Sequence, residues 1–191
     1  LNHPNIVQTL EVGEDDGCYF IGMEYLEGLP LGSLMSRSLP VPLPLEARLE
    51  IACQMLDGLS YLHQLADLDG SPLGLVHRDI SPSNVMLTFA GRVALLDFGV
   101  ATACGRFQTR SGAIKGKFNF LAPERVRGEA HDRRSDVYAL GVVLYQCLSR
   151  RLPFHADNDY DLLRSIARGK ARPLRHYVPT IAEPVERLVM R

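Results

Sequence analysis

The sequence lacks an excess of charge of either sign, and this excludes several classes of function. Its 21 Lys and Arg residues nearly balance its 22 Asp and Glu residues, so the formal net charge at pH 7 is -1. Proteins that hold nucleic acid or an anionic membrane surface through basic clusters carry a marked positive excess, so neither role is supported. Hydrophobic residues make up 46% of the chain and charged residues 23%, which is typical of a folded globular protein.

Paired cysteines, long hydrophobic stretches and a signal peptide are also missing. The cysteines form no Cys-x-x-Cys pair, which argues against a disulfide framework or a zinc site. They are Cys18, Cys53, Cys104 and Cys147. The longest nearly uncharged stretch, residues 137–149, is too short to span a bilayer. The chain opens on Leu1 with no recognisable signal peptide, so we expect a cytoplasmic protein with no membrane segment in this part.

Two pairs of short strands are predicted. Residues 6–12 and 18–25 are apolar, β-branched or aromatic runs separated by an acidic, glycine-flanked turn, which predicts a hairpin. Residues 84–87 and 93–96 form a second pair of apolar runs with a turn between them. Four prolines within residues 28–44 indicate a loop there, with at most a short helix around Leu34.

The rest of the chain is predicted to be mostly helical. Residues 45–65 predict a long helix, because their apolar side chains recur at helical spacing. These are Leu49, Ala52, Cys53, Leu56, Leu59 and Leu62. Residues 136–148 are apolar on every face and predict a buried helix. We expect further helices over 158–167 and 183–191 and a long functional loop over 97–121. Strands followed mostly by helices indicate the α+β class.

Three short motifs occur in a fixed order. They are His77-Arg78-Asp79 followed by Asn84, then Asp97-Phe98-Gly99, then Ala122-Pro123-Glu124. Each triplet alone is weak evidence, because most single Asp residues are surface turn carboxylates. Together, in this order and spacing, they resemble the catalytic half of a eukaryotic-type (Hanks-type) protein kinase, and the sequence around them is similar to bacterial serine/threonine kinases. The resemblance implies a mostly helical large lobe and an incomplete β small lobe.

The resemblance implies a site that transfers the γ-phosphate of ATP to a hydroxyl of a protein substrate. Asp79 would accept or orient the proton of that hydroxyl. The oxygens of Asn84 and Asp97 would hold Mg²⁺, with Mn²⁺ as an alternative. Gly99 would give the metal-binding loop its backbone freedom. His77 and Phe98 resemble packing residues of the regulatory spine.

The same resemblance suggests an adenine pocket between the two lobes. Met23 resembles the gatekeeper, and the backbone groups of Glu24 and Leu26 would hydrogen-bond adenine. Met86 would lie under the ring, two residues after Asn84. Ordinary core packing is the alternative explanation for both methionines.

Regulatory and supporting roles follow from the resemblance as well. Arg78 would receive a phosphate carried by Thr109 or Ser111; the alternative is that both are simply exposed loop hydroxyls. Asp136 would accept hydrogen bonds from the backbone around Arg78, because a carboxylate beside an apolar helix must be paired. Glu124 would give similar support, through an arginine that the sequence does not identify.

Two positions depart from the family pattern together. The family usually has a lysine two residues after the catalytic Asp, where this chain has Ser81. It usually has a threonine five residues before the Ala-Pro-Glu motif, where this chain has Lys117. In the family that lysine steadies the transferred phosphate. We hypothesise that the Lys117 ammonium reaches back and replaces the missing cation near Asp79; the alternative is a solvated loop charge.

The Gly-rich loop and the ATP-binding lysine of a kinase small lobe have no counterpart in this sequence. The first lysine is Lys115, and the early glycines flank an acidic turn that would repel phosphate. We therefore expect residues 1–26 to be a remnant of the small lobe and the hinge. Residues 27–191 would form a large lobe that is incomplete at its C-terminus. This chain alone is expected to be inactive.

Other functions fit part of the pattern. A pseudokinase or truncated interaction module is favoured if the native gene starts near Leu1, but it has no chemical need for the three polar residues of the site. A small-molecule phosphotransferase of kinase-like fold would share the catalytic Asp, but the Ala-Pro-Glu motif fits protein kinases better. The Ser81-Pro82 pair disfavours tyrosine specificity. The expected partners are ATP and a protein substrate, and no nucleic acid.

Overall fold

The computed structural model describes residues 2–35, 43–96 and 117–191. A two-stranded sheet consists of β1 (Thr9–Asp15) and β2 (Cys18–Met23), and a three-stranded sheet of β3 (Gly28–Pro30), β4 (Val85–Thr88) and β5 (Val93–Leu95) in that order. The helices are α1 (Leu31–Leu34), α2 (Leu45–His63), α4 (Pro123–Val126), α5 (Arg134–Ser149), α6 (Asp159–Arg168) and α7 (Glu183–Val189). Three 3-10 turns are η1 (Pro82–Asn84), η2 (Lys117–Phe120) and η3 (Leu174–His176).

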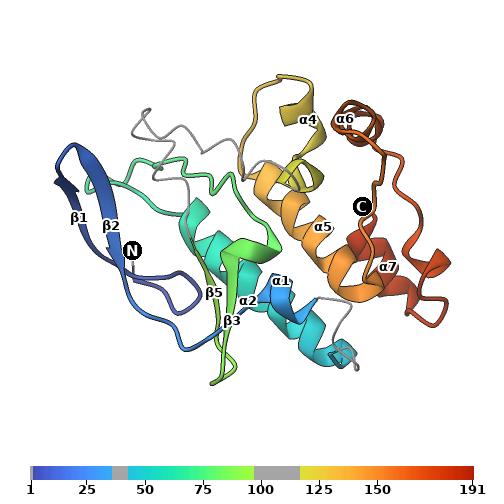
Figure 1. Ribbon diagram of the computed structural model, residues 1–191, viewed down its shortest axis with the longest axis horizontal. Coiled ribbons are helices and arrows are strands. Elements are labelled where there is room, and N and C mark those ends of the chain that lie inside the picture. Colours follow the sequence, from blue (N-terminus) through green and yellow to red (C-terminus); the bar gives the residue numbers. More distant parts are fainter. Residues whose placement is uncertain (1, 36–42, 97–116) are drawn as a thin grey trace.

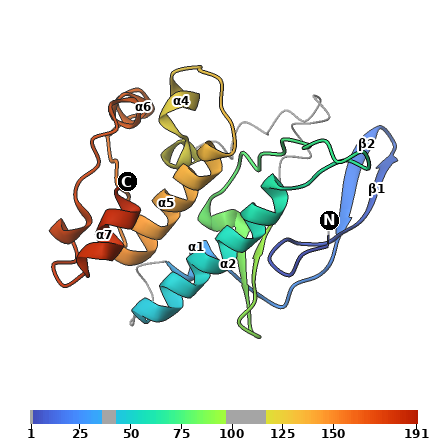
Figure 2. The ribbon, with the colours of Figure 1, turned by 180° about the vertical axis from the view of Figure 1, so that it is seen from behind.

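The strands gather toward one end of the molecule and the later helices toward the other, as the α+β prediction requires (Figure 1). The β1–β2 hairpin lies at the end opposite α6 and α7. Helix α2 lies behind the three-stranded sheet in Figure 1 and in front of it in Figure 2, so it covers one face of that sheet. The largest hydrophobic cluster joins α2, α5 and strands β4 and β5.

The predicted first hairpin is confirmed, with a later start than expected. Asp16 and Gly17 both have positive φ, 47° and 76°, and join paired residues Asp15 and Cys18, as in the two-residue turns that match the twist of a hairpin. The strand does not begin at Ile6, because the backbone there pairs with β5 instead. The Val7 amide donates to the Leu95 carbonyl at 2.9 Å. The N-terminal segment is therefore anchored to the second sheet.

The prediction of a loop over residues 28–44 is wrong at its start and right about the short helix. Gly28–Pro30 forms strand β3, which pairs antiparallel with β4. Proline is compatible with this position because β3 is an edge strand. A Cβ on Gly28 would collide with the Leu87 carbonyl oxygen, so this close pairing needs glycine. Helix α1 follows at once and includes Leu34.

Helices α2 and α5 confirm the two long helices predicted from the sequence. The buried face of α2 differs in part from the prediction, because Cys53 and Leu56 are exposed while Ile51 and Met55 are buried. Helix α5 is not buried on every face, since Val137 is 50% exposed. Helices α6 and α7 also lie where helices were expected. Among the described residues, no helix could cross a membrane.

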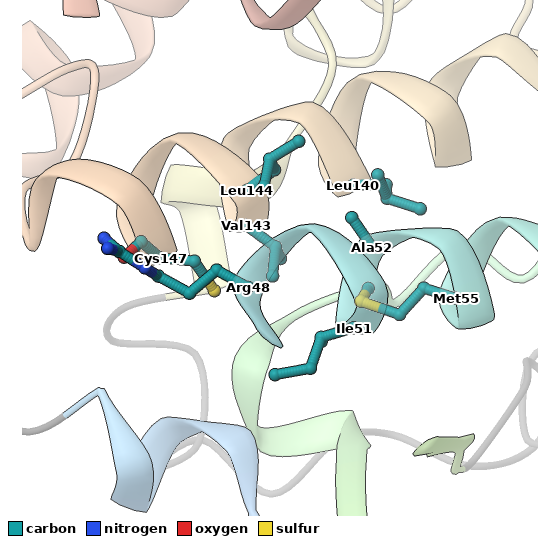
Figure 3. Close-up of a pocket in the computed structure, with 8 residues that line it drawn as sticks. All are labelled: Arg48, Ile51, Ala52, Met55, Leu140, Val143, Leu144 and Cys147. Atoms are coloured by element: carbon teal, nitrogen blue, oxygen red, sulfur yellow. The ribbon is translucent and has the colours of Figure 1, made fainter. Parts of the chain in front are cut away.

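A small pocket marks the contact between α2 and α5 (Figure 3). Its lining residues are Arg48, Ile51, Ala52, Met55, Leu140, Val143, Leu144 and Cys147, none of which is a predicted site residue. Arg48 donates through Nη1 to the carbonyl oxygen of Leu148 at 3.2 Å. Burial raises the pKa of the Cys147 thiol to about 12, which makes it an unreactive core residue. Cys18, Cys53 and Cys147 are all free thiols.

Gly58 in the middle of α2 permits the N-terminal segment to pack on this helix. A Cβ at Gly58 would lie 2.8 Å from the backbone oxygen of Asn5. We expect Gly58→Ala to lower the free energy of unfolding by about 1–3 kcal/mol, because backbone must move. Gly141→Ala in α5 is the matched control: its Cβ would meet nothing within 4 Å, so we expect a gain of up to about 1 kcal/mol. Urea-induced unfolding measures both, and equal effects of the two changes would refute the packing argument.

Candidate active site

The loop that carries the first motif is fixed to α5 through one buried carboxylate. Asp136, in the first turn of α5, is 1% exposed. Its Oδ2 accepts from the His77 amide at 2.8 Å and its Oδ1 accepts from the Arg78 amide at 2.8 Å. This is the arrangement that the sequence predicts. His63, at the end of α2, also contacts Asp136 through Nε2 at 2.8 Å, so three elements meet at this carboxylate.

His77 lies fully buried beneath the loop, as expected of a packing residue. Burial lowers its pKa, and this outweighs the opposing effect of the nearby Asp136 carboxylate. The imidazole therefore stays neutral at physiological pH.

The carboxylate of Asp79 is held from two sides. Asn84, in η1, donates through Nδ2 to Asp79 Oδ2 and to the Asp79 backbone oxygen, both at 2.9 Å. Lys117, in η2, donates from Nζ to the same Oδ2. Lys117 and Asp79 are both about one-third exposed, so the pair lies at the surface of the loop. Three predicted site residues are thus brought together.

Ser81 supplies no charge to the cluster of Asp79, Asn84 and Lys117. Its side chain is 3% exposed and its hydroxyl lies 2.9 Å from that of Ser83. Within the part of the chain that the structure describes, the cation in contact with Asp79 comes from Lys117.

Five predicted site residues lie outside the described residues: Asp97, Phe98, Gly99, Thr109 and Ser111. Among residues 2–35, 43–96 and 117–191, no group of three His, Cys, Asp or Glu side chains is placed to hold a metal ion. Asn84 is the predicted ligand that the structure describes. Because its amide nitrogen faces Asp79, its Oδ1 is the atom that it can offer to a cation.

The predicted adenine-pocket residues lie in two environments. Leu26 belongs to a small cluster with Val7 and Ala94, and Met86 packs against it. Met23 is 39% exposed at the end of β2, so the structure does not bring it into this cluster.

The Glu24 side chain faces the β4–β5 turn. It pairs with Arg92 at 2.6 Å, and the hydrogen bond from Arg92 is the main reason that its pKa is lowered. Its backbone amide donates to Gln8 at 3.0 Å.

Glu124 supports α5 through a residue that sequence reasoning missed. Its Oε1 accepts from the Ser135 hydroxyl at 2.7 Å. Tyr138 lies one turn further along α5, and its pKa is raised to about 12, first by burial and then by the charge of Glu124. His63 was also missed. The sequence carries no signal for either contact, because each joins helices that only the fold brings together.

Comparison with known proteins identifies the family. Residues 1–188 match the protein kinase domain. A tyrosine-protein kinase of Myxococcus xanthus (strain DK1622), MasK, is 42% identical over the whole chain. The serine/threonine-protein kinase PrkC of Bacillus subtilis (strain 168) is 32% identical over the whole chain, and PknB of Mycobacterium leprae (strain TN) is 36% identical over 83% of it.

The chain spans 30%, 28% and 25% of the lengths of these three relatives, respectively. The match nevertheless extends over nearly all of the present sequence and confirms the resemblance that the three motifs indicate. The chain belongs to the protein kinase domain family.

Proposed function

We propose that the protein containing this chain is a bacterial serine/threonine protein kinase, which transfers the γ-phosphoryl group of ATP to hydroxyl groups of protein substrates. The observation that carries the proposal is the arrangement around Asp79, whose Oδ2 is held by Asn84 and Lys117. Among the described residues no hydrogen bond to Asp79 Oδ1 is found. We assign Oδ1 to the hydroxyl of the acceptor.

In the proposed reaction, the acceptor oxygen bonds to the γ-phosphorus while the bond from that phosphorus to the β,γ-bridging oxygen breaks, so ADP leaves. The hydroxyl proton passes to Oδ1 of Asp79. Asn84 fixes both the carboxylate and the backbone of Asp79. Such fixed geometry contributes to the rate because the reacting groups need no further ordering.

We assign metal binding to Asn84 and Asp97, through the oxygen atoms that Mg²⁺ prefers. When bound, the metal would neutralise negative charge on the phosphates. We assign the adenine pocket to Leu26 and Met86, which pack in one cluster, and to the backbone of Glu24. Met23, which lies outside that cluster, stays a predicted gatekeeper.

Two finer assignments concern domains and regulation. We place the boundary between small-lobe and large-lobe segments at residues 26 and 27. The β1–β2 sheet shares no strand with the β3–β5 sheet, which supports this boundary, whereas residues 5–7 pair with β5 across it. We also propose that Arg78, which is exposed, receives a phosphate carried by Thr109 or Ser111.

The direct test is a phosphotransfer assay on the full-length protein with γ-labelled ATP, Mg²⁺ and general acceptor proteins. We expect label on serine or threonine, and removal of the metal with EDTA should abolish its incorporation. Absence of transfer by the full-length protein would refute the proposal and favour a non-catalytic interaction module. Label on a small molecule alone would indicate a small-molecule phosphotransferase.

Tyrosine phosphorylation is the second candidate activity. The relative that is 42% identical carries the name of a tyrosine-protein kinase, whereas other relatives are named serine/threonine-protein kinases. Acid hydrolysis of the labelled product separates phosphotyrosine from phosphoserine and phosphothreonine. Phosphotyrosine as the main product would overturn the proposed specificity but not the kinase activity.

Lys117 is expected to contribute directly to phosphoryl transfer. Its ammonium lies against Asp79, beside the place where the acceptor hydroxyl would meet the phosphate, and would replace the cation that Ser81 cannot supply. Removing one such charged donor from a site costs roughly 10²-fold in kcat. We therefore expect this loss for Lys117→Ala in the full-length protein, and partial recovery for Lys117→Arg.

The matched control is Lys170→Ala, which removes an exposed lysine just after α6. Steady-state kinetics with ATP should show its kcat unchanged. If Lys117→Ala also keeps the wild-type kcat, then Lys117 is only a surface charge.

A further inference from the structure

The peptide group between Arg78 and Asp79 is held on both sides. Its carbonyl oxygen, on Arg78, accepts a hydrogen bond from Arg125 Nη1 at 2.7 Å. Its amide, on Asp79, donates to His77 Nδ1 at 3.4 Å. The preceding amide of Arg78 is held by Asp136 at 2.8 Å. Three side chains thus fix the backbone immediately before Asp79: His77 from the same loop, and Arg125 and Asp136 from distant parts of the chain.

The backbone at Arg78 needs such support. Its φ is 70°, a left-handed conformation that is uncommon for residues with a Cβ and persists where neighbouring contacts enforce it. Rotation of the following peptide plane would redirect the Cα–Cβ bond of Asp79 and carry its carboxylate away from Asn84. The contacts on this plane therefore bear directly on where the carboxylate lies.

Arg125 is the contact on this plane that comes from beyond the loop itself. It lies in α4 (Pro123–Val126), a short helix that follows η2 with its Lys117. The segment from 117 to 125 thus touches the loop at two points, the Asp79 carboxylate through Lys117 and the Arg78 carbonyl through Arg125.

We propose that Arg125 is a positioning residue for Asp79: by holding the Arg78 carbonyl it sets the direction of the catalytic carboxylate. The inference rests on the proposed kinase function. Arg125 acts through the backbone, so its loss should slow the chemical step and leave nucleotide binding unchanged. A residue that merely ties α4 to the large lobe would affect stability instead.

Arg127 offers a matched comparison. Its Nη2 donates to the Ala167 carbonyl in α6 at 2.6 Å, a bond of the same type and length range to a helix that carries no proposed catalytic residue. Removing either arginine therefore deletes a similar bond to a backbone carbonyl, and at Arg127 also an exposed ion pair with Glu129. Only the bond of Arg125 lies beside Asp79.

The experiment compares Arg125→Met, Arg125→Lys and Arg127→Met in the full-length protein, with kcat and the KM for ATP measured for each. We expect Arg125→Met to lower kcat about tenfold while the KM for ATP stays within about twofold. Arg125→Lys keeps a donor and should recover much of the loss. Arg127→Met should keep the wild-type kcat.

Several outcomes would overturn the inference. They are a wild-type kcat for Arg125→Met, an equal loss for Arg127→Met, a loss that appears in the KM for ATP alone, or an Arg125→Met protein that is unfolded by circular dichroism. In each of these outcomes the wild-type protein still transfers phosphate, so the proposed kinase function would stand. A wild-type protein without phosphotransfer would instead refute the proposed function, and the positioning role with it.

Discussion

Replacing Asp136 by alanine is expected to lower the free energy of unfolding by about 3–5 kcal/mol, because it removes one partner of a buried polar group. The substitution leaves the amides of His77 and Arg78 without their acceptor, and His63 loses its contact. A buried donor without an acceptor costs about 1–3 kcal/mol. The free energy of unfolding of a single domain is about 5–15 kcal/mol, so this one change would remove a large part of the stability of the fold.

The control for this prediction is Asp132→Ala. Asp132 also lies near the start of α5, pairs with Arg134 at 3.0 Å and accepts the Arg134 backbone amide at 2.8 Å, but both side chains are exposed. Exposed pairs contribute about 0–1 kcal/mol. Urea-induced unfolding followed by circular dichroism compares the two variants. Asp136→Asn keeps one of the two carboxylate acceptors, so its free energy of unfolding should lie between those of Asp136→Ala and Asp132→Ala. Equal midpoints for Asp136→Ala and the wild-type protein would contradict the support role.

Replacing Asp79 by asparagine is expected to lower kcat by roughly 10²- to 10⁴-fold, the range for loss of a general base. The amide has nearly the same shape, but it cannot take the proton of the acceptor hydroxyl and no longer attracts the Lys117 ammonium. The fold should be unaffected, because the side chain is 35% exposed and belongs to no hydrophobic cluster.

The measurement is incorporation of γ-labelled phosphate into acceptor proteins by the full-length protein. Asp69→Asn serves as the control: Asp69 is an exposed carboxylate in the loop after α2 that accepts a backbone hydrogen bond from Ser71. We expect wild-type transfer from the control and a near-complete loss from Asp79→Asn. Substantial transfer by Asp79→Asn would show that the active carboxylate lies elsewhere.

The two largest expected effects concern residues that the sequence already singled out. Asp136 was identified through the family resemblance, since its backbone partners lie 59 and 58 positions away. For Asp79 the reason is local. Asp79 and Asn84 are five residues apart on one loop, so their hydrogen bond depends on a single turn of backbone, which η1 provides. The long helices were predictable for a similar reason. The apolar content and spacing along residues 45–65 and 136–148 predict that helices form there, whatever those helices pack against.

The predictions of strands and buried faces were wrong where the segments that pack or pair together are distant in sequence. Strand β3 was missed, because its proline-rich sequence indicates a loop and only pairing with β4 makes it a strand. The first strand was expected to begin at Ile6, but the segment there pairs with β5, almost ninety positions later. Leu56 is exposed because no other described element covers it, and the helical spacing of apolar residues in α2 does not reveal which elements pack against that helix.

The sequence by itself determined the family, because motif order and residue chemistry are properties of the chain, and it supplied the residues on which the proposed reaction rests. The tertiary structure decided which charges meet. It placed Lys117 on Asp79, His63 on Asp136 and Arg125 on the backbone before Asp79. Such contacts depend on distances between elements, and hydrophobic packing of α2, α5 and the sheet sets those distances.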